Sequence, residues 1–294
     1  GLGALPGVLL IPFKTIPKEP KRNTGDLEQP IAPVLQQHSV TAQKMAPITL
    51  LQALKLKRYW GRILGTAGGW FLFDITFYGN SLFQSVVLDQ VFGNHATSAP
   101  LSGGLQRNLC FQMVIIGAIG LPGYYISVCL MDRLGRRNIQ IQGFFFMAVL
   151  FLLLGLLYET LTRSTSGRVV MLILYGLTFF FSNFGPNSTT FILPSETFPE
   201  NIRTTLNGFS AAMGKLGATI GSAAFTPMKA SLGLQITMVV CAAVSLCGLL
   251  VSMLFVEDRR NKSMDDMDHE APSSNDTSWA STPMGIPINA TDGS

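Results

Sequence analysis

The chain has 294 residues, of which 48% are hydrophobic and only 13% charged, whereas soluble domains carry about 25% charged residues. It contains no nucleophile–base constellation, phosphate-binding glycine-rich loop or metal-ligand cluster, so we expect no enzyme activity, cofactor or metal site. The net charge of +4 follows from the membrane topology argued below, and we therefore expect no nucleic acid partner.

The chain begins with a short apolar segment, residues 1–13 (GLGALPGVLLIPF). A transmembrane helix needs about 20 apolar residues, so we expect this segment to be the end of a truncated transmembrane helix. Residues 14–61 are polar and proline-rich, a composition typical of a linker.

Helix-length apolar runs fill residues 62–256. Each run is long enough to cross a bilayer as a helix, and none shows the alternation of transmembrane β-strands. The sequence therefore predicts an all-α membrane protein with a six-helix bundle, whose spans lie at about 63–83, 109–131, 138–158, 169–193, 204–226 and 232–256. Residues 257–294 are rich in Asp, Ser, Asn and Thr, which predicts a disordered tail.

Lysine and arginine predict the orientation of this multi-pass protein. With the segments assigned alternately to the two sides, sixteen basic residues lie on the side of residues 14–62 and four on the other side. Since basic residues accumulate on the cytoplasmic side, we expect both the linker and the tail to be cytoplasmic.

The first span carries a carboxylate at its centre, Asp74. A charge at that depth costs at least ~2.5–3.5 kcal/mol, so its retention indicates a function. Trp70 and Tyr78 lie four residues before and after it, on the same helix face. Taken alone, these two aromatic residues are more typical of packing or of interface anchors. With the carboxylate between them, they favour a ligand site with hydrogen-bond donors.

Two later spans add polar groups. Pro186 predicts a bend near residues 182–185 of the fourth span, with Asn187 just beyond it. Broken helices at this depth line cavities in many transporters. The fifth span carries Lys215 in its interior. We expect Asp74 and Lys215 to meet across a shared site, the alternative being a purely structural buried ion pair.

Two predicted cytoplasmic turns hold further charges. The turn at 132–137 (DRLGRR) contains Asp132, Arg133 and Arg136, and the turn at 194–203 (PSETFPENIR) contains Glu196 and Arg203. These residues either form an ion-pair latch on one face or merely satisfy helix ends and topology.

Together these motifs resemble the major facilitator superfamily. The DRLGRR and PSETFPENIR turns are similar to signatures shared with sugar porters. The segments 65–85 (GTAGGWFLFDITFYGNSLFQS), 177–199 and 214–222 (GKLGATIGS) resemble the phosphate:proton symporters more specifically. The resemblance covers roughly residues 60–257. It implies that the six spans are helices seven to twelve, the C-terminal bundle of a major facilitator fold.

The resemblance also implies roles for individual residues. In such a symporter, phosphate is bound by residues matching Trp70, Asp74, Tyr78, Asn187 and Lys215, and the residue matching Asp74 is linked to proton coupling. A cytoplasmic salt-bridge network is implied for Asp132, Arg133, Arg136, Glu196 and Arg203. The implied partners are inorganic phosphate, protons, the lipid bilayer and an N-terminal six-helix bundle that is missing from this chain.

We therefore expect the C-terminal half of a proton-coupled inorganic phosphate transporter of the plasma membrane. One alternative is a sugar porter of the same superfamily, although neutral sugars require no membrane-buried Asp or Lys. Another is a non-transporting membrane sensor or partner half-protein.

Overall fold

The computed structural model describes residues 49–84, 87–88 and 103–258, and the side chains of 103–113 are not included in that description. All of these residues belong to one compact unit, Pro47–Ser294. The predicted helix end at 1–13, most of the predicted linker and the predicted tail from residue 259 onward lie outside the described residues.

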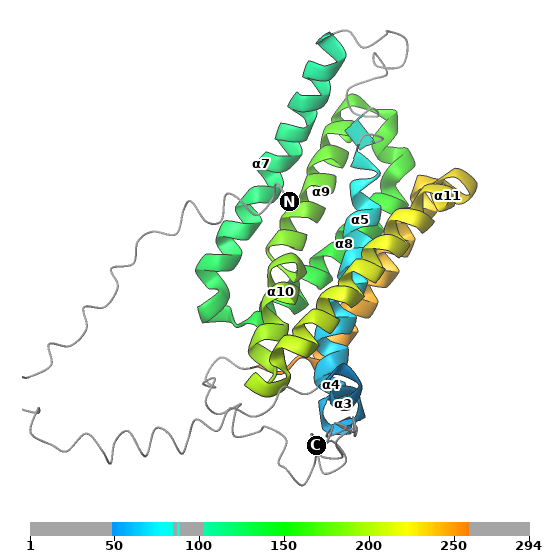
Figure 1. The fold of residues 1–294 in the computed structure, drawn as a ribbon. Helices are drawn as coiled ribbons and strands as arrows, with labels where there is room; N and C mark the ends of the chain where they lie inside the picture. The colour runs from blue at the N-terminus through cyan, green and yellow to red at the C-terminus, as the bar shows by residue number, and fades with distance from the viewer. Residues whose placement is uncertain (1–48, 85–86, 89–102, 259–294) are drawn as a thin grey trace, which may run out of the picture. The chain divides into compact units, whose positions relative to one another are not determined.

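The described part of the chain is helical and contains no strand (Figure 1). The elements follow one another along the chain as α3 (Leu50–Lys55), η2 (Lys57–Tyr59), α4 (Trp60–Ile63), η3 (Leu64–Gly68), α5 (Gly69–Ser81), α7 (Gly103–Leu134), α8 (Arg136–Arg163), α9 (Thr165–Asn183), α10 (Pro186–Thr197) and α11 (Glu200–Phe255). The predicted all-α architecture is thereby confirmed.

Within the described residues, four helical stretches are long and apolar enough to cross a membrane: Val114–Leu134, Arg136–Arg163, Thr165–Thr197 and Glu200–Phe255. The last of these, α11, joins the predicted fifth and sixth spans and bends at Gly233, whose φ is +83°. The predicted first span is a continuous run of α4, η3 and α5 in which η3 is a π-helix. The chain is therefore a helical membrane-spanning protein.

A break separates α9 from α10 where the sequence predicts a bend. Pro186 occupies the first turn of α10, where its missing N–H costs no helical hydrogen bond. The carbonyl of Phe184 instead accepts a hydrogen bond from the Gln142 amide of α8. A Cβ on Gly143 of α8 would lie 2.5 Å from the Cα of Gly185. The broken backbone therefore rests directly on α8, which leaves room for no side chain at either glycine.

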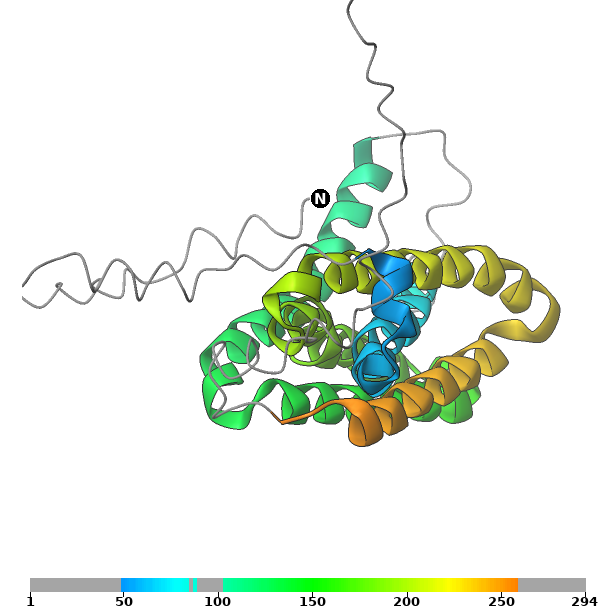
Figure 2. The same cartoon turned by 60° about the horizontal axis from the view of Figure 1, so that its bottom comes forward.

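The segment formed by η3 and α5 lies between the two arms of α11 (Figure 2). On the first arm, a Cβ on Gly217 or Gly221 would overlap the carbonyl oxygens of Phe71 and Ile75. On the second arm, the Phe255 carbonyl lies close to Gly65 of η3. Small residues allow such close approach of helix backbones in membranes. This contact sets the position of α5 against the arm that carries Lys215.

Residues 49–59, at the end of the predicted linker, pack against the start of α11. Ala53 and Tyr59 are fully buried there in a cluster with Phe198, Ile202 and Leu206. The Tyr59 and Phe198 rings meet edge to face at 6.3 Å. The basic segment that precedes the first span therefore packs its apolar side chains against the bundle.

The close contact between α5 and α11 makes Gly217 sensitive to substitution. Gly217→Ala would place a methyl group against the Phe71 carbonyl, so we expect a loss of about 1–3 kcal/mol of stability and a lower melting temperature in detergent. Gly208→Ala is the matched control. Gly208 lies on the same helix, and a Cβ added there meets nothing within 4 Å. Equal melting temperatures for the two variants would contradict this packing.

Candidate functional site

Asp74 lies in the middle of α5, and only 4% of its surface is exposed. Within the described residues its carboxylate forms no hydrogen bond and no ion pair shorter than 4.0 Å. Its oxygens are nevertheless not fully enclosed, since they are not among the buried side-chain atoms that lack a hydrogen-bond partner. Lys215 of α11 acts electrostatically on this carboxylate. A buried carboxylate thus has a cation nearby on α11.

Lys215 also approaches Tyr78, one turn beyond Asp74 on α5. Its Nζ lies 5.6 Å from the centroid of the Tyr78 ring, which is within the range of a cation–π contact. Both side chains are exposed. The two charges are therefore neighbours on one side of the bundle, and the ammonium group stays accessible.

Trp70 lies one turn before Asp74 and connects α5 with two other helices. A Cβ on Gly214, next to Lys215, would lie 2.5 Å from Cδ1 of the indole. On its other side, the indole meets the Phe191 ring edge to face at 6.1 Å. Phe191 lies on α10, four residues after Asn187 and so on the same helix face. Trp70 therefore joins the Lys215 arm of α11 to the Asn187 face of α10.

Asn187 lies one residue after the proline that begins α10. Its amide nitrogen donates to the Asn183 amide oxygen at 2.8 Å and to the Tyr124 hydroxyl of α7 at 2.5 Å. The Asn183 amide nitrogen in turn donates to the Gly120 carbonyl at 3.0 Å. Asn187 is therefore held directly by two polar groups, one of which is itself fixed by a backbone carbonyl, and does not project freely.

The structure thus brings the predicted residues onto α5, α10 and the first arm of α11. Three further residues contribute that sequence reasoning missed: Tyr124, Asn183 and Phe191. The spacing of Asn183, four residues before Asn187, was a usable signal. Tyr124 carried none, because only the packing of α7 on α9 brings it to Asn187. Within the described residues, no group of three His, Cys, Asp or Glu side chains is placed to hold a metal ion.

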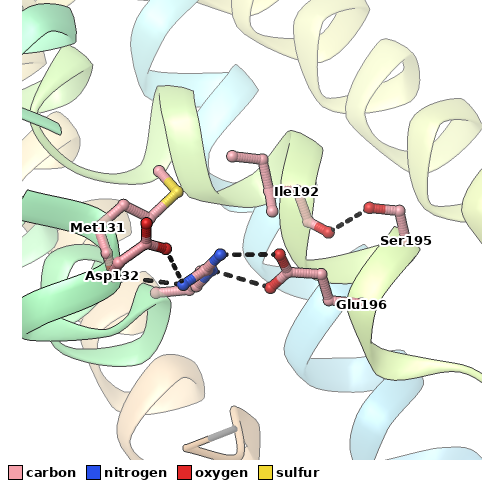
Figure 3. A network of polar contacts seen from close by, with 6 residues as sticks. Met131, Asp132, Ile192, Ser195 and Glu196 are labelled. Atoms are coloured by element: carbon pink, nitrogen blue, oxygen red, sulfur yellow. Dashed lines mark hydrogen bonds and ion pairs between the residues drawn. The ribbon is translucent and has the colours of Figure 1, made fainter. Parts of the chain in front are cut away.

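The turns at 132–137 and 194–203 meet at the guanidinium of Arg136. Its Nε and Nη2 lie 2.9 and 3.0 Å from the two Glu196 oxygens, and its Nη1 lies 3.0 Å from Asp132 Oδ1. Figure 3 shows both carboxylates directed at this one group. The fork joins the start of α8 to the end of α10, while Gly135, with φ of +82°, makes the turn from α7.

The other two predicted members are placed differently. Arg203 donates from Nε to the Phe198 carbonyl at 2.9 Å and so ties the start of α11 to the preceding turn. Arg133 is exposed and contacts none of the described carboxylates within 4.0 Å. A separate ion pair, Arg62–Glu257 at 3.0 Å, joins α4 to the residues that directly follow α11.

The two carboxylates of this network contribute unequally. The Glu196 side chain is 32% exposed and grips Arg136 with both oxygens, whereas the Asp132 side chain is 87% exposed. We expect Glu196→Ala to cost about 1.5–3 kcal/mol and Asp132→Ala less than about 1 kcal/mol. Thermal unfolding of both variants, combined with Arg136→Ala in double-mutant cycles, measures the two couplings. Equal couplings would show that the bidentate fork has no special weight.

Comparison with known proteins places this geometry in a family. The family described as "Sugar (and other) transporter" matches residues 44–271. A "Probable inorganic phosphate transporter 1-6" of Arabidopsis thaliana is 38% identical over 218 residues, which are 73% of this chain and 42% of that protein. An "Inorganic phosphate transporter 1-6" of Oryza sativa subsp. japonica is 36% identical over 297 residues, 92% of this chain and 55% of that protein.

A third relative, a "Low affinity inorganic phosphate transporter 1" of Petunia hybrida, is 35% identical over 251 residues, which are 79% of this chain and 46% of that protein. The chain spans about half the length of the curated relatives it matches. With a match over most of its helical part, the chain belongs to the sugar (and other) transporter family of the major facilitator superfamily.

Proposed function

We propose that this chain is the C-terminal half of a proton-coupled inorganic phosphate transporter. The observation that carries the proposal is the buried Asp74 carboxylate beside the accessible Lys215 ammonium. The relatives named inorganic phosphate transporters supply the substrate class. The Lys215 charge attracts the anion, the Trp70 indole and the Tyr78 hydroxyl donate hydrogen bonds to its oxygens, and Asn187 orients it.

Charge balance at the site couples the proton to the anion. With Asp74 ionised and Lys215 protonated, the empty site has no net charge. Entry of H2PO4⁻ leaves one uncompensated negative charge in a poorly solvated region, which is costly. A proton on Asp74 restores neutrality and releases Lys215 to the phosphate. Each ligand therefore favours binding of the other, as thermodynamic linkage requires.

One side of the proposed site carries exposed side chains from three helices. Tyr78, Phe191 and Lys215 are exposed on α5, α10 and α11. Alternating access in such transporters requires two bundles that rock about a central site. We propose that an N-terminal six-helix bundle covers this face and supplies the remaining ligands. The Asp132–Arg136–Glu196 network then holds the cytoplasmic ends of α7, α8 and α10 together during that motion.

The setting follows from the same proposal. A nutrient importer of this kind acts in the plasma membrane, without enzyme activity. The excess of basic residues on the side of residues 14–61 orients the linker and the tail to the cytoplasm.

Two substitutions separate the proposed roles of the charged pair. In the protein expressed from its complete gene, we expect Asp74→Asn to abolish proton-driven phosphate accumulation, because the site can no longer exchange a proton. We expect Lys215→Ala to weaken phosphate binding at least about tenfold, because a charge-assisted contact is lost. Phosphate uptake into energised vesicles, with and without a protonophore, measures both effects.

Lys57→Ala is the matched control, since it removes the same charge from an exposed position in η2. Normal proton-driven uptake by Asp74→Asn would overturn the proposal. The family match also covers sugar transporters. Hexose uptake that excess hexose inhibits and phosphate does not would therefore assign the site to a sugar porter instead.

A further inference from the structure

The hydrogen bonds around Asn187 have a fixed direction, which begins at a backbone carbonyl. The Gly120 carbonyl can only accept a hydrogen bond, so the group of Asn183 that faces it at 3.0 Å is the amide nitrogen. The Asn183 oxygen therefore faces Asn187 and accepts from it at 2.8 Å. The orientation of Asn187 is thus determined by a group that cannot reverse its role.

Both hydrogens of the Asn187 amide nitrogen are then in use. One goes to Asn183 and the other to the Tyr124 hydroxyl. Helix packing keeps these partners in register, because a Cβ on Gly120 would lie 3.2 Å from Phe179 and one on Gly123 would lie 3.0 Å from the Phe184 nitrogen. α7 therefore packs directly on α9 beside this chain of hydrogen bonds. We call the chain, which links the Gly120 carbonyl, Asn183, Asn187 and Tyr124, the relay.

Two functional groups of the relay are left for a ligand. Within the described residues, the Asn187 oxygen accepts no hydrogen bond, and it is not among the sealed atoms without a partner. Tyr124 accepts from Asn187 but finds no described acceptor for its own hydrogen. Both residues are half-buried. The relay therefore presents one acceptor, on Asn187, next to one donor, on Tyr124.

We infer that Tyr124 and Asn183 make the site selective for tetrahedral oxyanions that carry a hydroxyl group. This inference rests on the proposed phosphate transport and deepens it. Dihydrogen phosphate offers a P–OH hydrogen to the Asn187 oxygen and an unprotonated oxygen to the Tyr124 hydroxyl. Sulfate has no hydrogen at neutral pH, so one of its oxygens would face the Asn187 oxygen and repel it. An unpaired polar group of this kind rejects an analogue strongly.

The test measures anion selectivity in the protein expressed from its complete gene and reconstituted in liposomes. Inhibition constants of arsenate and sulfate are compared with the KM for phosphate. In the wild type, we expect arsenate, which also carries a hydroxyl, to compete within about tenfold of phosphate and sulfate to be at least about 100-fold weaker. We expect Asn183→Leu, which lets the Asn187 amide rotate, to reduce the discrimination against sulfate about tenfold or more.

Tyr124→Phe is the second variant, because it removes the donor and releases one Asn187 hydrogen while it keeps the ring. We expect it to reduce the sulfate discrimination as well. Tyr125→Phe is the matched control: it makes the same change one residue along α7, at a side chain that is 41% exposed and has no described hydrogen bond. Because selectivity is a ratio, it does not depend on how much folded protein each variant yields.

The outcomes distinguish a failure of the selectivity inference from a failure of the proposed phosphate transport. Phosphate uptake by the wild type with equally strong competition from sulfate overturns the selectivity inference and leaves the phosphate transporter standing. Unchanged sulfate discrimination in both Asn183→Leu and Tyr124→Phe overturns it as well. A wild type that transports no phosphate overturns both.

Discussion

The structure depends on the cost of charge in a poorly solvated region. Asp74 is almost completely buried, and Lys215 acts on it from the neighbouring helix. A chain that only had to fold would gain from an apolar residue at position 74, because a buried carboxylate without a hydrogen bond is costly. Under the proposed function both charges have a use, Asp74 in binding a proton and Lys215 in binding an anion.

Close backbone contacts give this pair its geometry. Gly217 and Gly221 bring α11 against the carbonyls of α5, and Gly143 brings α8 against the break before α10. In each case, the absence of a side chain lets one helix rest on another at a distance that flexible side chains could not maintain. Such contacts are stiff. The candidate site is therefore positioned by rigid helices, although its residues come from three of them.

Two of the polar networks within the described residues lie at different levels of the bundle. The Arg136 fork joins helix ends in a partly exposed setting, where solvent and salt screen it. The relay from Gly120 through Asn183 to Asn187 lies at the helix break, where α9 has ended and free backbone groups need partners. Breaking a helix thus creates both a need for side-chain hydrogen bonds and a place where a ligand can reach them.

The sequence by itself determined the helical membrane fold, since long apolar runs have no other stable form in a bilayer. It also predicted the break at Pro186 and marked Asp74 as a candidate site residue, because a missing N–H and a charge in hydrocarbon are local facts. Only the tertiary structure decided which helices meet. It brought Tyr124 to Asn187, set Trp70 between Gly214 and Phe191, and left Arg133 outside the Arg136 fork. These outcomes depend on the register between helices, which is fixed by contacts between residues far apart in the chain and leaves no periodic signal.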